Sequence, residues 1–238
     1  MNNNLPFLPT LILENKFSQS DLDFITTKVE NNSKMIPSVQ SWPGPTQGKT
    51  LSHRYLWKWQ NHNDISTIIN QALPSVVSSN MMCPEPFILE SFIPYEIHND
   101  YGWFGNALEL SEDEIPFYLV IIPLLTCDAK TIILNQYGEY CHFVNYKEKN
   151  DPLPLADQMT EEEYQKYFSH CWPQERPYIS IQNIFKWVAG SVLLCDIRYF
   201  HASDNFLKNN LDVKKCITLM TKIKKDKFLS AQQNLVAQ

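Results

Sequence analysis

Short runs of apolar, β-branched and aromatic residues fill the last two-thirds of this 238-residue chain. Runs of this length, separated by polar or Pro- and Gly-containing segments, are typical of strands. The predicted strands are residues 86–98, 116–125, 130–135, 140–146, 178–185, 190–197 and 214–223. The charged segment 160–169 interrupts them and predicts a helix.

The first third of the chain has a different pattern. Residues 6–15 predict an opening strand, and residues 18–32 predict a helix capped by Ser18 or Ser20. Three apolar residues fall on one stripe of this helix: Leu22, Ile25 and Val29. A second helix is predicted around residues 64–77. Helices followed by many strands indicate an antiparallel sandwich or barrel backed by helices, and not an alternating α/β sheet.

The length suits one domain over residues 1–238. We expect a strand and helix flank with a possible lid in residues 1–86 and a β core in 87–223. Residues 224–238 read as a polar, mobile tail. The Pro- and Gly-rich segment 41–50 resembles a phosphate-binding loop, but its glycines are too close together and a strand-like pattern follows. We interpret it as a surface loop or lid, to which nearby side chains could contribute: Trp42, Arg54, Trp57 and Trp59.

Composition and charge narrow the function classes. A formal net charge of −6 argues against a protein held to nucleic acid by phosphate contacts. The six cysteines form no CxxC pair, which favours a reducing, cytoplasmic setting over a zinc knuckle or a disulfide framework. We find no signal peptide and no run of membrane-spanning length.

The sequence HND at residues 98–100 carries the candidate chemistry. In an extended chain His98 and Asp100 point the same way, while Asn99 points opposite. An imidazole beside a carboxylate supplies two of the three ligands of the facial triad that binds non-haem Fe(II). A third ligand is expected on a late strand, and His201 closes the apolar run that begins at Gly190. The remaining histidines are not favoured as ligands: His53 and His62 lie in the N-terminal part, His142 lies mid-strand and His170 lies beside a helix end.

HxD, a distal histidine and a basic residue opening the last strand together resemble the Fe(II)/2-oxoglutarate-dependent dioxygenases. The resemblance is strongest to prolyl-hydroxylase-like members. It implies a double-stranded β-helix (jelly roll, cupin-like) with helices packed outside, which agrees with the strand order. It also implies Fe(II), 2-oxoglutarate and O2 as cofactors and co-substrates, with ascorbate as a reductant. The implied activity is hydroxylation of an unactivated C–H of an amino-acid side chain, free or in a polypeptide, or of a small metabolite, with release of succinate and CO2.

The resemblance requires a cation for the distal carboxylate of 2-oxoglutarate. No arginine follows His201, so the candidates are Lys214 and Lys215. Residues i and i+2 share a face of a strand. Lys214 shares its face with the small residues Cys216 and Thr218, which leave room for a ligand, whereas the alternate positions are bulky aliphatics. Parity and the family's spacing therefore favour Lys214.

Further positions match the family by motif. Tyr95 resembles the tyrosine of YxxHxD that lines the pocket, with a core aromatic as the alternative. Thr131 resembles the threonine of a GGxTxFP element near 2-oxoglutarate, although both glycines are missing here. Arg198 lies where some protein hydroxylases have a substrate-contacting arginine, with a salt bridge to Asp196 as the alternative.

The substrate itself is not defined by the sequence. The aromatic residues that follow Asp100, among them Tyr101 and Trp103, would wall the pocket mouth or pack in the core. We expect a small molecule or polypeptide as substrate, without nucleic acid or membrane as partner. Two other functions stay open: a non-catalytic metal- or 2-oxoglutarate-binding module acting as a sensor or scaffold, and a metal-dependent hydrolase or isomerase of the cupin type.

Overall fold

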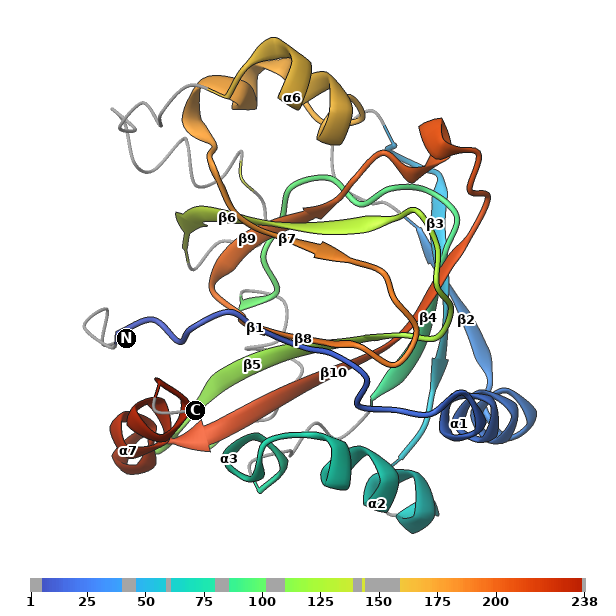
Figure 1. Cartoon of the computed structure of the whole chain (residues 1–238), viewed down its shortest axis with the longest axis vertical. Helices are drawn as coiled ribbons and strands as arrows, with labels where there is room; N and C mark the ends of the chain where they lie inside the picture. The colour runs from blue at the N-terminus through green and yellow to red at the C-terminus, as the bar shows by residue number, and fades with distance from the viewer. Residues whose placement is uncertain are drawn as a thin grey trace.

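A computed structural model of the chain describes residues 6–39, 46–58, 61–79, 86–101, 110–138, 143 and 159–236. Its strands form two antiparallel sheets that face each other (Figure 1). The larger sheet has the order β1 (Leu11–Leu13), β8 (Val192–Asp196), β5 (Glu114–Pro123), β10 (Lys214–Lys224), β4 (Phe87–Ser91), β3 (Thr50–Leu56) and β2 (Met35–Val39). The smaller sheet has the order β7 (Ile181–Lys186), β6 (Lys130–Tyr137) and β9 (Tyr199–Ser203). The predicted fold, a mainly β double-stranded β-helix with helices outside, is confirmed.

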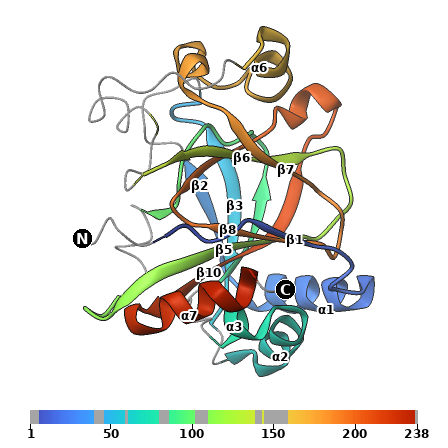
Figure 2. The same ribbon diagram turned by 60° about the vertical axis from the view of Figure 1, so that its left-hand side comes forward.

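Helices lie on the outer side of the larger sheet, and others lie beside the smaller one (Figures 1 and 2). The first group consists of α1 (Gln19–Asn32), α2 (Asn63–Ala72), α3 (Ser75–Ser78) and α7 (Lys225–Val236). The second consists of α6 (Glu161–Tyr167) and the 3-10 helix η2 (Pro173–Tyr178). A short 3-10 helix, η3 (Phe206–Asn209), lies between β9 and β10. None of the helices in the described ranges is both long and apolar enough to cross a membrane.

Side chains along strand β10 point alternately to the two sides of the larger sheet. Ile217 and Leu219 belong to the hydrophobic cluster shared with the helices. Cys216 and Met220 belong to a second cluster, on the side that faces the smaller sheet. Because side chains alternate along a strand, Lys214 points to the inner side together with Cys216.

Helix α1 forms as the sequence predicts. Ser18, and not Ser20, is the N-cap: its side chain accepts a hydrogen bond from the backbone N–H of Asp21, whose carboxylate accepts one from Ser18 N–H. This reciprocal capping box satisfies backbone donors that the first helical turn leaves open. The apolar stripe is buried as expected: Leu22, Ile25 and Val29.

The prediction of a mobile tail is wrong. Residues 225–236 form helix α7, whose side chains Phe228, Ala231 and Leu235 are buried in the same cluster as the outer side of the sheet. Their spacing of three and four residues places them on one helical face. The many polar residues between them conceal this pattern in the sequence.

The long strand predicted over residues 86–98 is also wrong in part. Strand β4 ends at Ser91, and His98 makes only an isolated bridge with His201. Strands β2 and β9 were not predicted, and β1 to β3 extend the larger sheet beyond the expected 87–223 core. The predicted strand 140–146 lies outside the described residues except for Phe143.

Truncating Phe228 tests the packing of α7. Its side chain is 1% exposed and contacts the Phe117 ring edge-on, with centroids 6.0 Å apart. We expect Phe228→Ala to lower the free energy of unfolding by about 3–5 kcal/mol, because a buried aromatic leaves a cavity. Leu229→Ala is the control, since Leu229 is 55% exposed. Urea unfolding of both variants should separate them; equal, small losses would contradict the docking of α7.

Candidate active site

The candidate site is a cavity of about 250 Å³ between the two sheets. The larger sheet contributes residues of β2, β3, β4, β5 and β10 to its lining, and the smaller sheet contributes residues of β6 and β9. Six of the site residues predicted from the sequence line it: Tyr95, His98, Asp100, Thr131, His201 and Lys214. Segments far apart in the chain therefore meet in one cavity.

His98, Asp100 and His201 form a compact cluster of ligand atoms. One nitrogen or oxygen atom from each lies within 4.8 Å of the other two. Asp100 Oδ2 is 3.4 Å from His201 Nε2, and the two imidazole centroids are 4.5 Å apart. Within the described part of the chain, this is the group of histidine, cysteine and acidic side chains with metal-ligand spacing.

Backbone hydrogen bonds bring the two histidines together. His98 N–H donates to His201 O at 3.0 Å, and His201 N–H donates to His98 O at 2.7 Å. Asn99 points away from the cavity, is fully buried and donates its amide to Gly138 O at 2.9 Å. The alternation expected of His98, Asn99 and Asp100 is thus present although this segment is not a regular strand.

The ring orientation of both histidines is set by carbonyl groups. His98 Nδ1 contacts Glu96 O at 2.7 Å, and His201 Nδ1 contacts Tyr199 O at 3.3 Å. A carbonyl oxygen only accepts, so each Nδ1 carries a proton and each Nε2 is the ring atom left for a metal. Burial, reinforced by His201, lowers the pKa of His98 to about 4, against a smaller opposing effect of Asp100. His98 is therefore neutral at neutral pH, as a metal ligand must be.

Lys214 lies in the cavity, and Lys215 does not. Lys214 is 3% exposed, and its Nζ donates to Ser203 Oγ at 2.6 Å and lies 4.3 Å from the centroid of Trp187. Burial lowers the pKa of Lys214 from 10.5 to about 8. Lys215 points to the other side of the sheet and forms an ion pair with Glu30. This placement agrees with the parity argument.

Two further hydroxyl groups lie at the cavity wall. Thr131 Oγ1 accepts a hydrogen bond from Trp187 Nε1 at 3.0 Å, next to the ring that Lys214 covers. The Tyr95 hydroxyl is 2.6 Å from Ser52 Oγ, and its ring centroid is 5.6 Å from that of His98. Both residues therefore line the cavity, as the resemblance to the family motifs predicts. Their roles stay predictions.

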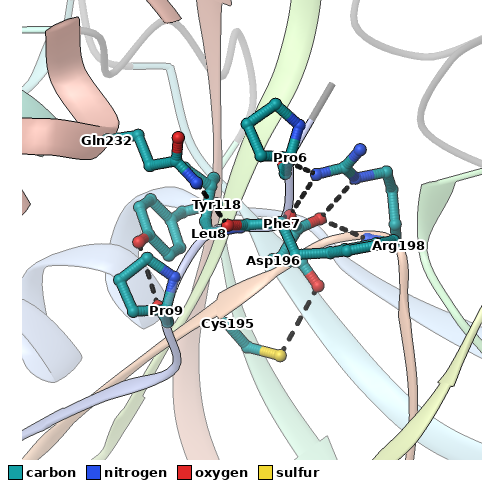
Figure 3. A network of polar contacts seen from close by, with 9 residues as sticks. All are labelled: Pro6, Phe7, Leu8, Pro9, Tyr118, Cys195, Asp196, Arg198 and Gln232. Atoms are coloured by element: carbon teal, nitrogen blue, oxygen red, sulfur yellow. Dashed lines mark hydrogen bonds and ion pairs between the residues drawn. The ribbon is translucent and has the colours of Figure 1, made fainter. Parts of the chain in front are cut away.

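Arg198 is outside the residues that line the cavity. Its Nε and Nη2 donate to the two carboxylate oxygens of Asp196 at 2.9 and 2.6 Å (Figure 3). Nη2 also donates to Pro6 O at 2.8 Å, and the guanidinium carbon lies 4.3 Å from the Phe7 ring centroid. Asp196 in turn accepts from Leu8 N–H at 3.0 Å. The geometry thus supports the salt-bridge alternative, in which Arg198 and Asp196 fasten the N-terminal segment to the sheet.

Of the aromatic residues predicted to wall the pocket mouth after Asp100, only Tyr101 is among the described residues. Tyr101 does not line the cavity and packs against the inner hydrophobic cluster, which agrees with its core alternative. Trp103 lies outside the described residues.

Three other residues at the cavity wall were not predicted from the sequence: Ser203, Ser91 and Trp187. Ser203 could have been found by parity, because it follows His201 by two positions in β9. Ser91 pairs directly with Lys214 across the β4–β10 ladder. Its Oγ is buried and has no hydrogen-bond partner among the described residues. No local sequence signal indicated Ser91 or Trp187.

No protein-family model and no curated protein sequence matches this chain. Solved structures do match its fold. SnoN, a non-heme alpha ketoglutarate dependent epimerase from nogalamycin biosynthesis, has a TM-score of 0.53 and 8% identity over 91% of this chain and 79% of its own. HygX from Streptomyces hygroscopicus, solved with nickel and 2-oxoglutarate, has a TM-score of 0.52 and 11% identity over 92% and 84%. SnoK, a non-heme alpha ketoglutarate dependent carbocyclase, has 0.50 and 14% over 95% and 90%. At such identities the likeness establishes a shared fold and no more.

The buried ammonium of Lys214 should reduce stability in the absence of ligands. The pKa change from 10.5 to about 8 corresponds to about 3 kcal/mol at pH 7. We expect Lys214→Met to unfold at higher urea concentration than the unmodified protein at pH 7. Between pH 8 and 10.5 the unfolded chain binds the Lys214 proton while the folded chain does not, so wild-type stability rises with pH and the gap narrows.

Lys215→Met is the matched control, because it removes the neighbouring ammonium from the opposite side of the strand and breaks the ion pair with Glu30. Unfolding curves at pH 7 and pH 9.5 measure both variants. A stability gain that does not depend on pH would contradict the assignment to the Lys214 charge.

Proposed function

We propose that this protein is an Fe(II)- and 2-oxoglutarate-dependent dioxygenase. The observation that carries the proposal is the cluster of His98, Asp100 and His201 in the same cavity as the buried Lys214. Two imidazoles and one carboxylate are the donor set of the facial triad, which leaves positions open for other ligands. Structures of the same fold, SnoN, SnoK and HygX, are described with alpha ketoglutarate dependence or with bound 2-oxoglutarate.

The residues present fit the metal. Each imidazole would offer its Nε2 to the metal, since the Nδ1 atoms are held by backbone carbonyls. Asp100 supplies the one carboxylate, which lies close to His201. When bound, Fe(II) would supply the redox chemistry with O2 that protein side chains lack. The carbonyls of Glu96 and Tyr199 would hold both rings in their ligating orientation.

The residues around Lys214 fit a carboxylate. Lys214 Nζ contacts a serine hydroxyl and an aromatic face but forms no ion pair in the described ranges. The buried Ser91 Oγ, opposite Lys214 in register, has an unused donor. An ammonium and a hydroxyl removed from water favour an anion that accepts from both. We therefore assign the distal carboxylate of 2-oxoglutarate to Lys214, with Thr131 and Tyr95 on the adjacent wall.

The three proposed protein ligands restrict the type of reaction only in part. Asp100 completes three protein ligands, so hydroxylation of a C–H bond with release of succinate and CO2 is the default. An epimerase and a carbocyclase share this fold, so the same scaffold also supports other outcomes. We place the substrate among amino acids and other small molecules. The protein is proposed to act in the cytoplasm, with ascorbate as a reductant.

Removing the ligands tests the metal assignment. We expect His98→Ala and Asp100→Ala each to lower iron-dependent succinate formation from 2-oxoglutarate by a factor of 100 or more, on the order expected when an essential metal ligand is lost. His53→Ala is the control, because His53 faces Glu90 outside the cavity. Succinate is measured by chromatography with and without added iron. Unchanged formation in the two ligand variants would refute the assignment, and no formation in the wild type would favour a binding module.

Removing the cation tests the anchor. We expect Lys214→Met to raise KM for 2-oxoglutarate on the order of 100-fold, because a buried carboxylate would lose its charged partner. Lys215→Met should change KM by less than about 3-fold. Since only the protonated amine binds the anion, wild-type affinity should be constant below pH 8 and fall above it. If Lys214→Met keeps the full activity of the wild type, no cationic anchor is needed, and a cupin-type hydrolase or isomerase is favoured.

A further inference from the structure

The loop between α6 and η2 contains a histidine that the proposed function leaves unused, His170. It belongs neither to the group with metal-ligand spacing nor to the lining of the cavity. Its Nε2 lies 3.0 Å from Tyr95 O, in the segment that leads to the ligands. We propose that His170 is a positioning residue, which through this hydrogen bond fixes residues 95–98 and with them the His98 imidazole. The inference rests on the proposed function, because it concerns the geometry of the proposed metal site.

The imidazole of His170 is a neutral donor to this carbonyl. Removal of the ring from water lowers the pKa of His170 to about 4, against an opposing effect of the bond to Tyr95 O, so the ring is uncharged at neutral pH. A neutral imidazole carries one proton, and a carbonyl oxygen only accepts, so that proton is on Nε2. Nδ1 is buried and has no hydrogen-bond partner among the described residues. The Cys171 Sγ, 3.5 Å from Nε2, is at most a weak partner. The bond to Tyr95 O is therefore the main polar contact of the ring.

The Tyr95 carbonyl lies where the ligand segment joins the smaller sheet. It also accepts a hydrogen bond from Ser203 N–H at 3.2 Å. Ser203 follows His201 by two residues in β9, and His98 follows Tyr95 by three residues in the opposite segment. Between these points, His98 and His201 exchange their two backbone hydrogen bonds. His170 thus adds a second donor at the end of the short ladder that holds both imidazoles.

Side-chain packing holds the same segment from the same side. Ile97, directly before His98, is 3% exposed and belongs to the hydrophobic cluster on the outer side of the smaller sheet. Phe168 and Cys171, which precede and follow His170 in the sequence, belong to this cluster too. Helix α6 lies on that side of the sheet (Figure 1). The ligand segment is therefore held between β9 and the α6 layer, and His170 is the polar contact to that layer.

The loop that carries His170 is itself fastened independently of Tyr95. Asn205 Nδ2 donates to Ser169 Oγ at 2.8 Å, and Lys208 Nζ donates to Gln165 O at 3.2 Å. Both donors come from the chain just after β9. Because these bonds fix the loop to the smaller sheet, His170 can restrain the Tyr95 carbonyl and does not simply follow it.

Two amide substitutions test the hydrogen bond. The side-chain nitrogen of glutamine reaches about as far from the backbone as histidine Nε2, whereas that of asparagine is nearer, at the depth of Nδ1. We expect His170→Asn to raise the Kd for Co(II), which replaces Fe(II) as a probe, by about 10-fold, the low end of the effect of losing a hydrogen-bond partner around metal ligands. His170→Gln should stay within about 3-fold of the wild type. His170→Leu, which has no donor, should resemble His170→Asn.

Titration of metal-free protein with Co(II) alone, followed by visible absorption, measures the Kd. The absorption at saturating Co(II) is a second readout, because it reports the arrangement of the ligands. We expect it to change in His170→Asn and His170→Leu and to be retained in His170→Gln.

Tyr164→Phe is the matched control, because it removes one hydrogen bond within the same layer, from the Tyr164 hydroxyl to Trp172 O at 2.7 Å. Urea unfolding of the metal-free proteins measures the stability of every variant. We expect Tyr164→Phe to lose stability but to keep the wild-type Kd and absorption of Co(II), which separates positioning of the ligands from a general loss of stability.

The inference is wrong if His170→Asn and His170→Leu bind Co(II) as the wild type does. It is also wrong if Tyr164→Phe weakens binding as much as they do, or if His170→Gln restores nothing. Should His170→Leu not fold, the comparison of His170→Asn with His170→Gln decides by the same criteria.

His98→Ala distinguishes this failure from failure of the proposed function. Co(II) binding that is lost in His98→Ala but unchanged in the His170 variants would leave the metal site standing and remove only the role of His170. Co(II) binding that His98→Ala leaves unchanged would remove both.

Discussion

The candidate site depends on one reciprocal pair of backbone hydrogen bonds, between His98 and His201. These bonds join the irregular segment after β4 to strand β9 of the smaller sheet. Without these bonds, nothing would hold the imidazoles of two residues 103 positions apart next to each other. Asn99 secures the segment from the other side, because its buried amide contacts Gly138 at the end of β6. The candidate metal-ligand cluster therefore depends on backbone pairing between the segment after β4 and strand β9.

A second constraint is the alternation of side chains along β10. Ile217 and Leu219 bind the helical layer to the larger sheet, while Lys214 and Cys216 face the smaller one. The same strand thus contributes to the main hydrophobic core and to the cavity. Burying Lys214 costs stability, and the hydrophobic packing on the opposite face of the strand offsets that cost. A ligand anion would recover part of it.

Local sequence patterns predicted the elements whose formation depends on nearby residues. Spacing within one element is enough to predict the capped helix α1, its buried stripe of Leu22, Ile25 and Val29, and the inward direction of the Lys214 side chain. The failures have a common cause. Helix α7 and the end of β4 at Ser91 are decided by what packs against them, and polar composition or apolar runs alone misassign such segments.

The sequence by itself determined the candidate ligands, their order and the expected fold, because HND, His201 and Lys214 stand in recognisable register within their own segments. Only the tertiary structure decided which other residues share the cavity. Arg198 forms an ion pair with Asp196 and contacts the N-terminal segment, whereas Arg54 and Ser91 line the cavity through pairings between strands distant in the sequence. Such pairings are set by the register of whole sheets, and no local pattern of residues encodes them.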